Sequence, residues 1–311
     1  MKLYCGGKVS QESYTFTKYL CSTRPFSKSQ VDRLGEFYAG KRSSPPASHV
    51  EIIAWYEWLK AQTLNLVSFA IASQERDGQG PFEIAQSSRV KTKTSIADKI
   101  NRGARLSTMQ DFAGVRFDVE ATHSTLLKIA STIKSLAEQA HATARIRNYL
   151  TNPQRGYRAV HVWLTSKTAG RVEIQLRTQL QAEWANTFEK LADLTGRRIR
   201  YEDDYQPSDP YLRATLANLL GLSESFYVSE AHLEKGFNSA QINLQAINTP
   251  TRAIRVDPLV HRERAKIFQT MARYEETLAN TAETNIDSLK VLRQTQDILA
   301  RYPYGKGRNY D

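Results

Sequence analysis

The stretch from Arg171 to Arg177 reads Arg-Val-Glu-Ile-Gln-Leu-Arg and combines the residue types of a catalytic surface with the spacing of a strand. Side chains of a strand alternate between its two faces. One face is therefore apolar, and the other carries four polar side chains: Arg171, Glu173, Gln175 and Arg177. Such a row is suited to binding phosphates and a metal ion, although an amphipathic edge strand with ion-paired charges has the same pattern.

A second group of candidates surrounds the start of a predicted helix. Ser95 and Asp98 have the spacing of a capping box, so we expect the helix to begin near Ser95. A helix N-terminus flanked by cations is an anion site. The candidates are Arg89 and Lys91 in the arm before the helix, and Ser95, Lys99 and Arg102 on one helix face. The alternative is a solvated basic helix end.

Asp111 is a third candidate, in the sequence Asp-Phe-Ala-Gly-Val-Arg that leads into a predicted strand. Magnesium typically takes one or two carboxylates together with substrate phosphates, so an acid at the mouth of a strand can ligate it. The alternative is an acidic turn residue that caps a backbone amide.

Tyr157 and His161 form the fourth candidate group, after a turn signalled by Asn152-Pro153 and Gly156. The two residues share one face of a predicted strand. Tyrosine can stack on a base, and histidine can reach a phosphate. The alternative is a buried tyrosine and a core histidine.

Short strands and helices must position these residues. Apolar spacing predicts helices at 50–75 and 123–140, strands at 115–119, 158–165 and 170–177, and a helix from Thr178. Strands that alternate with helices predict a layered α+β domain with a mixed sheet and flanking helices. Two long amphipathic stretches, 209–235 and 257–300, predict a helical extension. We therefore expect four parts: a mostly helical segment over 1–80, the α+β domain over 81–205, the helical extension over 206–301 and a flexible tail over 302–311.

Charge and hydropathy narrow the function classes. The net charge is +11, and residues 81–200 hold 20 of the 43 basic residues but only 10 of the 32 acidic ones. A field of this sign attracts nucleotide phosphates or an RNA backbone. The chain has no run of 18 apolar residues and no signal-peptide core near Met1, so we expect a cytoplasmic protein without a membrane span. It also lacks the Gly-x-x-x-x-Gly-Lys-Ser/Thr loop of P-loop ATPases.

The order of the four motifs resembles the synthetase domain of the RelA/SpoT family of alarmone synthetases over roughly residues 85–200. The motifs are the basic arm, Asp111-x-x-Gly-x-Arg, Gly156-Tyr-Arg-x-x-His, and Glu173-x-Gln-x-Arg-Thr followed by Glu183-Trp-Ala. The resemblance implies a nucleotidyltransferase-like synthetase fold. It also implies an enzyme that moves the β,γ-pyrophosphate of ATP to the 3′-hydroxyl of GDP or GTP, with Mg²⁺, and releases AMP.

The same resemblance implies a role for each candidate. Asp111 and Glu173 are the catalytic acids and metal ligands, and Glu173 is also suited to activating the acceptor hydroxyl. The ATP-phosphate set is Arg89, Lys91, Ser95, Lys99 and Arg102, and the acceptor set is Tyr157, His161, Gln175 and Arg177. No histidine is followed by aspartate, so the hydrolase of longer family members is not expected.

Other readings stay open. Some small family members resemble toxins that modify the 3′ end of tRNA, and an adenine nucleotide is a further acceptor. Surplus cations could guide an acceptor stem: Arg145, Arg147, Arg155, Arg197, Arg198 and Arg200. A non-catalytic nucleotide-sensing module is the third reading. The C-terminal helices are expected to pack on the catalytic domain, with self-association or binding of a neutralising protein partner as alternatives.

Overall fold

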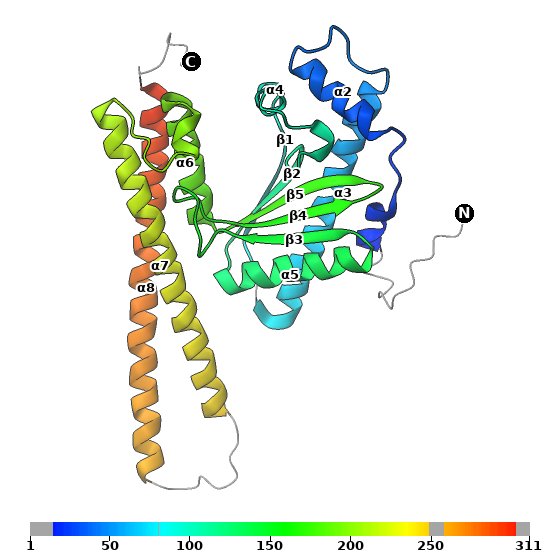
Figure 1. Ribbon diagram of the computed structural model, residues 1–311. Helices are drawn as coiled ribbons and strands as arrows, with labels where there is room; N and C mark the ends of the chain where they lie inside the picture. The colour runs from blue at the N-terminus through cyan, green and yellow to red at the C-terminus, as the bar shows by residue number, and fades with distance from the viewer. Residues whose placement is uncertain (1–14, 80, 249–257, 303–311) are drawn as a thin grey trace. The chain divides into compact units, whose positions relative to one another are not determined.

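The computed structural model describes residues 15–79, 81–248 and 258–302 (Figure 1). Contacts divide the chain into two compact units. The sheet unit comprises residues 1–152 and 159–178, and the helical unit comprises residues 153–158 and 179–311. Most of the predicted tail, and the first residues of the predicted N-terminal segment, lie outside the described residues.

Five strands form the sheet in the order β1-β2-β5-β4-β3. They are β1 (Ile84–Val90), β2 (Ala113–Val119), β3 (Thr143–Asn148), β4 (Val160–Ser166) and β5 (Gly170–Arg177). β2 and β5 run parallel, whereas the other neighbouring pairs are antiparallel. A parallel pair needs a crossover, and helix α5 with strands β3 and β4 supplies it between β2 and β5. The predicted α+β class with a mixed sheet is confirmed.

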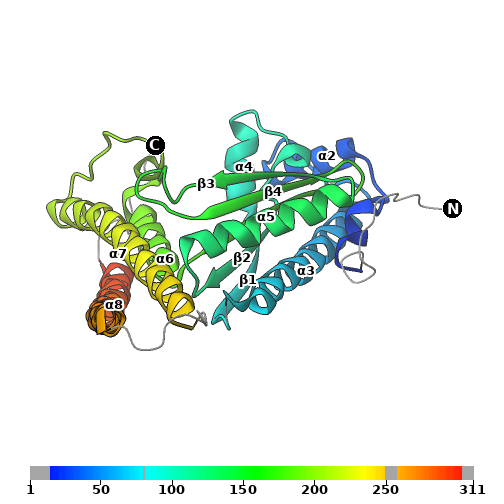
Figure 2. The same cartoon turned by 90° about the horizontal axis from the view of Figure 1, so that it is seen from below.

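One face of the sheet is apolar and is covered by α3 (His49–Gln74) and α5 (His123–Gln139) (Figure 2). Burial alternates along β2, as expected for a strand with one covered face. From α5, Leu126, Ile129 and Ile133 point into this layer and are fully buried. The helices predicted at 50–75 and 123–140 are therefore confirmed, because their apolar residues recur at helical spacing.

The opposite face carries polar side chains in rows that cross the sheet. One row runs over β2, β5, β4 and β3 through Arg116, Gln175, His161 and Arg147. The next row runs through Gly114, Glu173, Trp163 and Arg145. Along β5, the predicted alternation holds, with apolar residues buried and Arg171, Glu173 and Gln175 partly exposed.

One expectation near residue 95 is wrong. Helix α4 (Lys93–Asn101) begins earlier, because Thr92 is its N-cap and accepts a hydrogen bond from the Ser95 N–H at 3.3 Å. Arg89 lies upstream of α4, as expected, and is part of β1, where it pairs with Gly114. Strand β1 is an exposed edge strand with few apolar residues, so it lacks the alternation that marks a half-buried strand.

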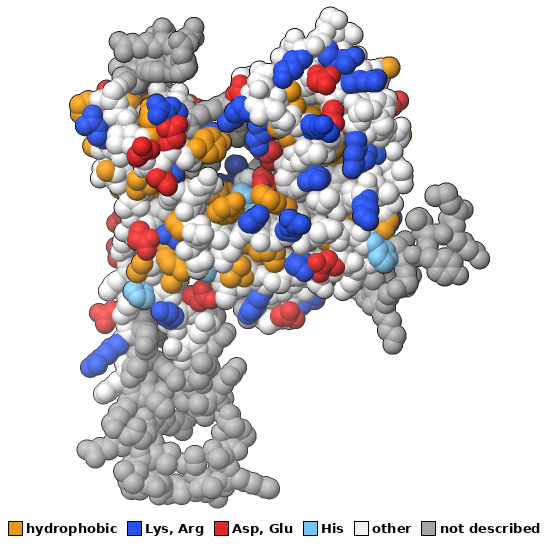
Figure 3. All heavy atoms as spheres, viewed as in Figure 1, with side chains coloured by type: hydrophobic (Ala, Val, Ile, Leu, Met, Phe, Trp, Pro, Cys, Tyr) orange, Lys and Arg blue, Asp and Glu red, His pale blue; other side chains and the backbone are white. Residues whose placement is uncertain are grey.

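The sheet unit also contains α2 (Lys28–Tyr38), which packs on α4. Ser27 and Gln30 form a complete capping box at its start. Short helical turns complete this unit: η1 (Lys18–Cys21), η2 (Glu75–Gln79) and η3 (Leu106–Thr108). Figure 3 shows Lys and Arg side chains spread over the surface around α2 and α4.

The helical unit contains α6 (Gln179–Thr195), η4 (Arg197–Arg200), α7 (Pro210–Asn248) and α8 (Pro258–Arg301). Trp184 of α6 is buried, stacks on Phe188 at 4.9 Å between ring centroids, and donates its indole N–H to the Leu219 carbonyl at 2.6 Å. The predicted helix after Thr178 and the two predicted long helices are confirmed, with α7 reaching Asn248. Among the described helices, none is long and apolar enough to cross a bilayer.

The two units group the chain differently from the four expected parts. Helices α2 and α3 pack with elements of the sheet unit, so residues before 80 join that unit. Helix α6, which sequence placed in the α+β domain, packs with α7 and α8. The apolar stripe of α6 explains this grouping, because Trp184, Phe188 and Leu191 join one core with residues of α7 and α8.

Candidate active site

Glu173 lies in the middle of β5 with three donors around its carboxylate. Its Oε1 accepts from the Trp163 indole at 3.1 Å and lies 3.2 Å from His161 Nδ1, and its Oε2 accepts from the Gln175 amide at 2.9 Å. Burial raises the pKa of Glu173, but the hydrogen bonds from His161 and Gln175 and the charge of His161 outweigh burial, so this pKa lies below its ordinary value. Glu173 is therefore an oriented carboxylate that is ionised at neutral pH.

Asp111 lies just before β2 and is held by two lysines. Lys91 forms an ion pair with Oδ2, and Lys99 of α4 lies 2.9 Å from Oδ2 and 3.1 Å from Oδ1. Burial raises the pKa of Asp111, but the hydrogen bonds and charges of the two lysines lower it below its ordinary value. Burial is also the main cause of the lowered pKa of Lys91. The structure thus brings Asp111 together with two members of the predicted ATP-phosphate set, Lys91 and Lys99.

The two acids belong to one electrostatic site. The charge of Asp111 raises the pKa of Glu173, in opposition to the donors that lower it. The parallel pairing of β2 with β5 explains this proximity, because it places Gly114 beside Glu173, and Asp111 precedes Gly114 by one short turn of chain.

Gln110 ties the Asp111 loop to the strands that carry the other site residues. Its side-chain amide donates to the carbonyl oxygens of Leu164 in β4 and Val172 in β5, both at 2.7 Å. Val172 precedes Glu173 directly, so this contact fixes the spacing between the two acids. Gln110 was not among the predicted site residues, because its one signal in the sequence is that its amide side chain lies next to Asp111.

The remaining donors on the sheet form a chain of contacts. Arg116 donates from Nε to Gln175 Oε1 at 3.3 Å, and Gln175 donates to Glu173, so Gln175 orients the acid. His161 is buried, and its ring lies 5.0 Å from that of Tyr149. The predicted neighbours His161 and Gln175 are therefore brought to Glu173, and their contacts to an acceptor stay predictions.

The other members of the predicted ATP-phosphate set are dispersed around α4. Ser95 lies in its first turn, and its hydroxyl accepts from Thr92 at 2.9 Å. Arg102 is the exposed C-cap residue, and its Nε donates to the Asp98 carbonyl at 3.2 Å. Of this set, Lys91 and Lys99 are the two that contact Asp111.

Arg177 differs from the rest of the polar row on β5. Its side chain is only 2% exposed and lies 2.8 Å from Asp118 of the neighbouring β2, with a second donor at 2.9 Å. Separating a buried guanidinium from its carboxylate leaves an unpaired charge, so Asp118 holds Arg177 in place. The contact of Arg177 with an acceptor stays a prediction. It would require Arg177 to leave Asp118, or to bind the acceptor while it is still paired with Asp118.

Tyr157 belongs to the helical unit, whereas Asp111, His161 and Glu173 belong to the sheet unit. Within its unit, Tyr157 packs against the core cluster that contains Trp184 and Leu219. Its backbone N–H donates to the Gln154 carbonyl at 2.9 Å, which closes the turn before β4.

Trp163 was not among the predicted site residues, and no contact within the chain was predicted for Arg147. Trp163 donates to Glu173, and the Arg147 guanidinium lies over the Trp163 ring at 5.0 Å from its centroid. A tryptophan in a strand is usually a core residue, so only the register opposite Glu173 could have identified it.

The two acids fit a magnesium ion. Ionised carboxylates are the oxygen ligands that Mg²⁺ prefers, and it takes few of them when substrate phosphates complete its shell. In the described part of the chain, no group of three or more His, Cys, Asp or Glu residues could hold a metal.

Comparison with known proteins finds related sequences. Residues 88–191 match the region found in RelA/SpoT proteins. The uncharacterized protein Rv1366 of Mycobacterium tuberculosis is 34% identical over 211 residues, which are 66% of this chain and 73% of that protein. Mb1401 of Mycobacterium bovis, also named as uncharacterized, matches to the same extent.

Two solved structures also align with the chain. Small alarmone synthetase 2 from Bacillus subtilis gives a TM-score of 0.45 at 24% identity, over 60% of this chain and 96% of that one. A GTP pyrophosphokinase family protein from Streptococcus pneumoniae gives 0.48 at 22% identity, over 66% and 99%.

The family match contains every residue that forms the acidic site, from Lys91 to Gln175. Together with the mycobacterial relatives, it shows that this chain belongs to the RelA/SpoT family.

Proposed function

We propose that this chain is an ATP-dependent pyrophosphokinase that transfers the β,γ-pyrophosphate of ATP to the 3′-hydroxyl of GDP or GTP and releases AMP. Membership in the RelA/SpoT family supports a transferase of this class. The observation that carries the proposal is the pair of ionised carboxylates, Asp111 and Glu173, at one electrostatic site rimmed by lysines.

The lysines and Asp111 suit the donor nucleotide. Phosphoryl-type transfer needs positioning and positive charge over the transferred group more than covalent help. Lys91 and Lys99 supply that charge, and in the free chain they neutralise Asp111. A triphosphate can take over the ammonium groups and release the carboxylate for magnesium. Magnesium held by Asp111 and Glu173 would supply charge neutralisation for the phosphates.

Glu173 suits the acceptor hydroxyl. Its lowered pKa makes it a weak base, but a loose transition state places little demand on base strength, because the hydroxyl loses its proton late. The donors Trp163, His161 and Gln175 hold the carboxylate in one orientation. We propose that Glu173 accepts a hydrogen bond from the 3′-hydroxyl and then takes its proton.

Transfer to tRNA is the second candidate, based on the surplus cations. Three of these arginines are engaged within the helical unit: Arg155 donates to backbone carbonyls, Arg198 pairs with Glu202, and Arg200 pairs with Glu189. Arg155 is held by carbonyl oxygens and is less available to an RNA backbone, whereas the pair of Arg198 with Glu202 is exposed and can be exchanged for a phosphate. Transfer to tRNA therefore stays the second candidate.

The test incubates the full-length chain with Mg²⁺ and ATP labelled on its γ-phosphate, and offers GDP, GTP, ADP and tRNA in separate reactions. We expect AMP and a labelled guanine nucleotide from GDP or GTP, and neither from the Glu173→Gln variant. Labelling of tRNA alone would favour the second candidate. Absence of AMP release with every acceptor would contradict an enzymatic role and leave a nucleotide-sensing module.

A further inference from the structure

The turn that carries Tyr157 is held by the helical unit, although it connects two strands of the sheet. Residues 153–158 lie between β3 and β4 in sequence, but their contacts group them with α6, α7 and α8. The reasons lie in four consecutive residues, from Arg155 to Arg158.

Arg158, the residue after Tyr157, is anchored on one turn of α7. Its side chain is 6% exposed, its Nε donates to Ser223 Oγ at 3.2 Å, and its guanidinium pairs with Glu224. The guanidinium also lies over the Tyr227 ring, 4.4 Å from the centroid. Ser223 in turn donates to the Gly156 carbonyl at 2.5 Å, so one hydroxyl ties the residues on both sides of Tyr157 to α7.

The start of the turn is fixed just as firmly. Arg155 donates to the carbonyls of Ile199, Asp203 and Tyr205 at 3.1, 2.5 and 3.0 Å. Gly156 has φ 78°, and a Cβ there would lie 2.8 Å from the Trp184 ring. Both the conformation and the close approach therefore require glycine.

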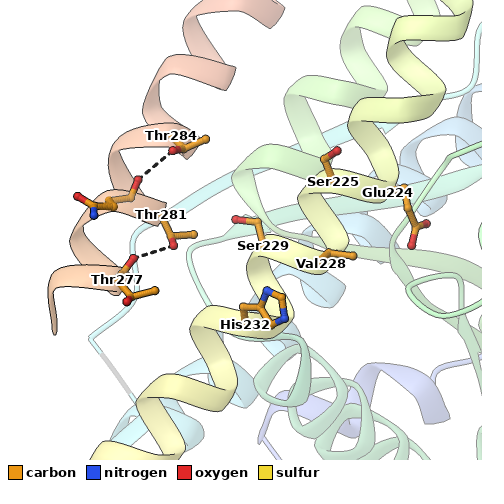
Figure 4. A pocket seen from close by; sticks show the side chains of 9 residues that line it. Glu224, Ser225, Val228, Ser229, His232, Thr277, Thr281 and Thr284 are labelled. Carbon is orange, nitrogen blue, oxygen red and sulfur yellow. Dashed lines mark hydrogen bonds between the residues drawn. The ribbon is translucent and has the colours of Figure 1, made fainter. Parts of the chain in front are cut away.

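Glu224 also borders a groove in the helical unit. This groove of about 630 Å³ lies between α7 and α8, and Figure 4 shows Glu224 pointing away from the threonines of α8. The hydroxyls of Thr281 and Thr284 donate to carbonyls of their own helix. The partner that the structure gives Glu224 is Arg158.

We propose that Arg158, Ser223 and Glu224 are positioning residues that set the place of Tyr157, so that α7 controls affinity for the acceptor. This inference rests on the proposed function, in which Tyr157 stacks on the base of the acceptor. Helix α7 then acts on acceptor binding through the Tyr157 turn, which belongs to the same unit. A change on α7 should alter acceptor KM and leave the ATP site of the sheet unit unchanged.

The test uses Glu224→Gln and Ser223→Ala in the full-length chain, with Ser225→Ala as the matched control. Glu224 has a side chain that is 64% exposed, so its substitution leaves the core intact. The Ser225 hydroxyl donates only along its own helix, to the Gly221 carbonyl. We expect acceptor KM to rise about tenfold in both test variants, as for loss of a hydrogen bond to a charged group. KM for ATP should stay within about twofold, and Ser225→Ala should match the wild type in both constants.

Hydrogen exchange is a second measurement, which tests how firmly the Tyr157 turn is held without requiring catalytic activity. The Tyr157 amide should exchange faster in both test variants, while the Trp184 region stays protected. Unchanged exchange, an unchanged acceptor KM, or equal rises in both KM values would overturn the proposal. A wild-type chain that releases no AMP with any acceptor would remove the proposed function, and faster exchange would then leave a purely structural anchor.

Discussion

Around Asp111, the sheet unit has a partly exposed ion pair that a ligand can replace, whereas in the Tyr157 turn of the helical unit two arginines make contacts that shape the backbone. Lys99 and Asp111 form an ion pair with side chains that are 38% and 25% exposed. In the helical unit, Arg155 donates to three carbonyl oxygens, and the Arg158 side chain is only 6% exposed.

The difference separates sites from anchors in a chain that is basic throughout its middle. An exposed ammonium can exchange a carboxylate for a phosphate at little cost, because water screens both partners. A buried guanidinium cannot leave its partners without exposing unpaired groups. Arg177 with Asp118 lies in the sheet unit but belongs to the second class by burial. Burial and partner type, and not charge alone, therefore identify the residues available to a nucleotide.

The largest expected effect is on Glu173. The substitution Glu173→Gln removes the charge but keeps the size and an acceptor oxygen, so turnover should fall about 1,000-fold. Thermal unfolding should change little. Initial rates of AMP release measure turnover, and a melting curve measures stability. Adding Gln175→Glu to the Glu173→Gln variant tests whether an acid elsewhere in the row restores activity. Turnover of Glu173→Gln near that of the wild type would contradict a catalytic role for Glu173.

Arg177→Ala should affect stability first. Removing one partner of a buried ion pair typically costs about 3 kcal/mol or more. Asp118 keeps a side chain that is 20% exposed, so we expect the lower end of that range, about 3 kcal/mol. Chemical denaturation measures the loss, and Arg171→Ala on the same face of β5 is the matched control. An Arg177→Ala variant that keeps its stability but has a raised acceptor KM would show that Arg177 contacts the acceptor and does not mainly stabilise the fold.

Asp111→Asn should show a pH-dependent loss of stability. The pKa of Asp111 is lowered in the folded chain, so its contribution is complete above its unfolded pKa of about 4 and disappears as pH falls through the folded value. Asparagine does not titrate. The stability of the wild type relative to Asp111→Asn should therefore be greatest at neutral pH and shrink below about pH 4. A difference that stays constant from pH 7 to pH 3 would contradict the lysine contacts.

The smallest expected effect is on the exposed pair Arg198–Glu202. Its side chains are 67% and 41% exposed, so Arg198→Ala should leave the melting temperature unchanged within error. A salt titration of tRNA binding by the same variant sharpens the comparison between units. A clearly reduced salt slope would show that this arginine contacts RNA phosphates, in favour of the second candidate function.

Patterns within one segment predicted much of the fold and part of the site. Alternation along Arg171–Arg177 identified β5 and its polar face, and apolar spacing identified α3, α5 and the long C-terminal helices. Glycine, proline and asparagine marked the turn before β4. The motifs identified Lys91, Lys99 and Asp111 as candidates, but the pairing of the lysines with Asp111 appears only in the structure.

Patterns failed where a neighbouring segment decided the outcome. The N-cap is Thr92 and not Ser95, because the Thr92 hydroxyl accepts the Ser95 N–H and Ser95 therefore lies inside the first turn of α4. Strand β1 was missed because it is an edge strand whose polar residues give no alternation. Trp163 looked like core, and its hydrogen bond to Glu173 depends on the register of β4 against β5.

The sequence by itself determined the kind of chemistry, because residue types and their spacing decide which charges can share a strand or a helix end. Tertiary structure decided which charges are available for it. Parallel pairing of β2 with β5 brought Asp111 to Glu173, burial against Asp118 withdrew Arg177, and packing on α7 took the Tyr157 turn into the helical unit. Each outcome depends on a partner far away in the chain, and such contacts follow from the summed packing of many segments and not from any local pattern.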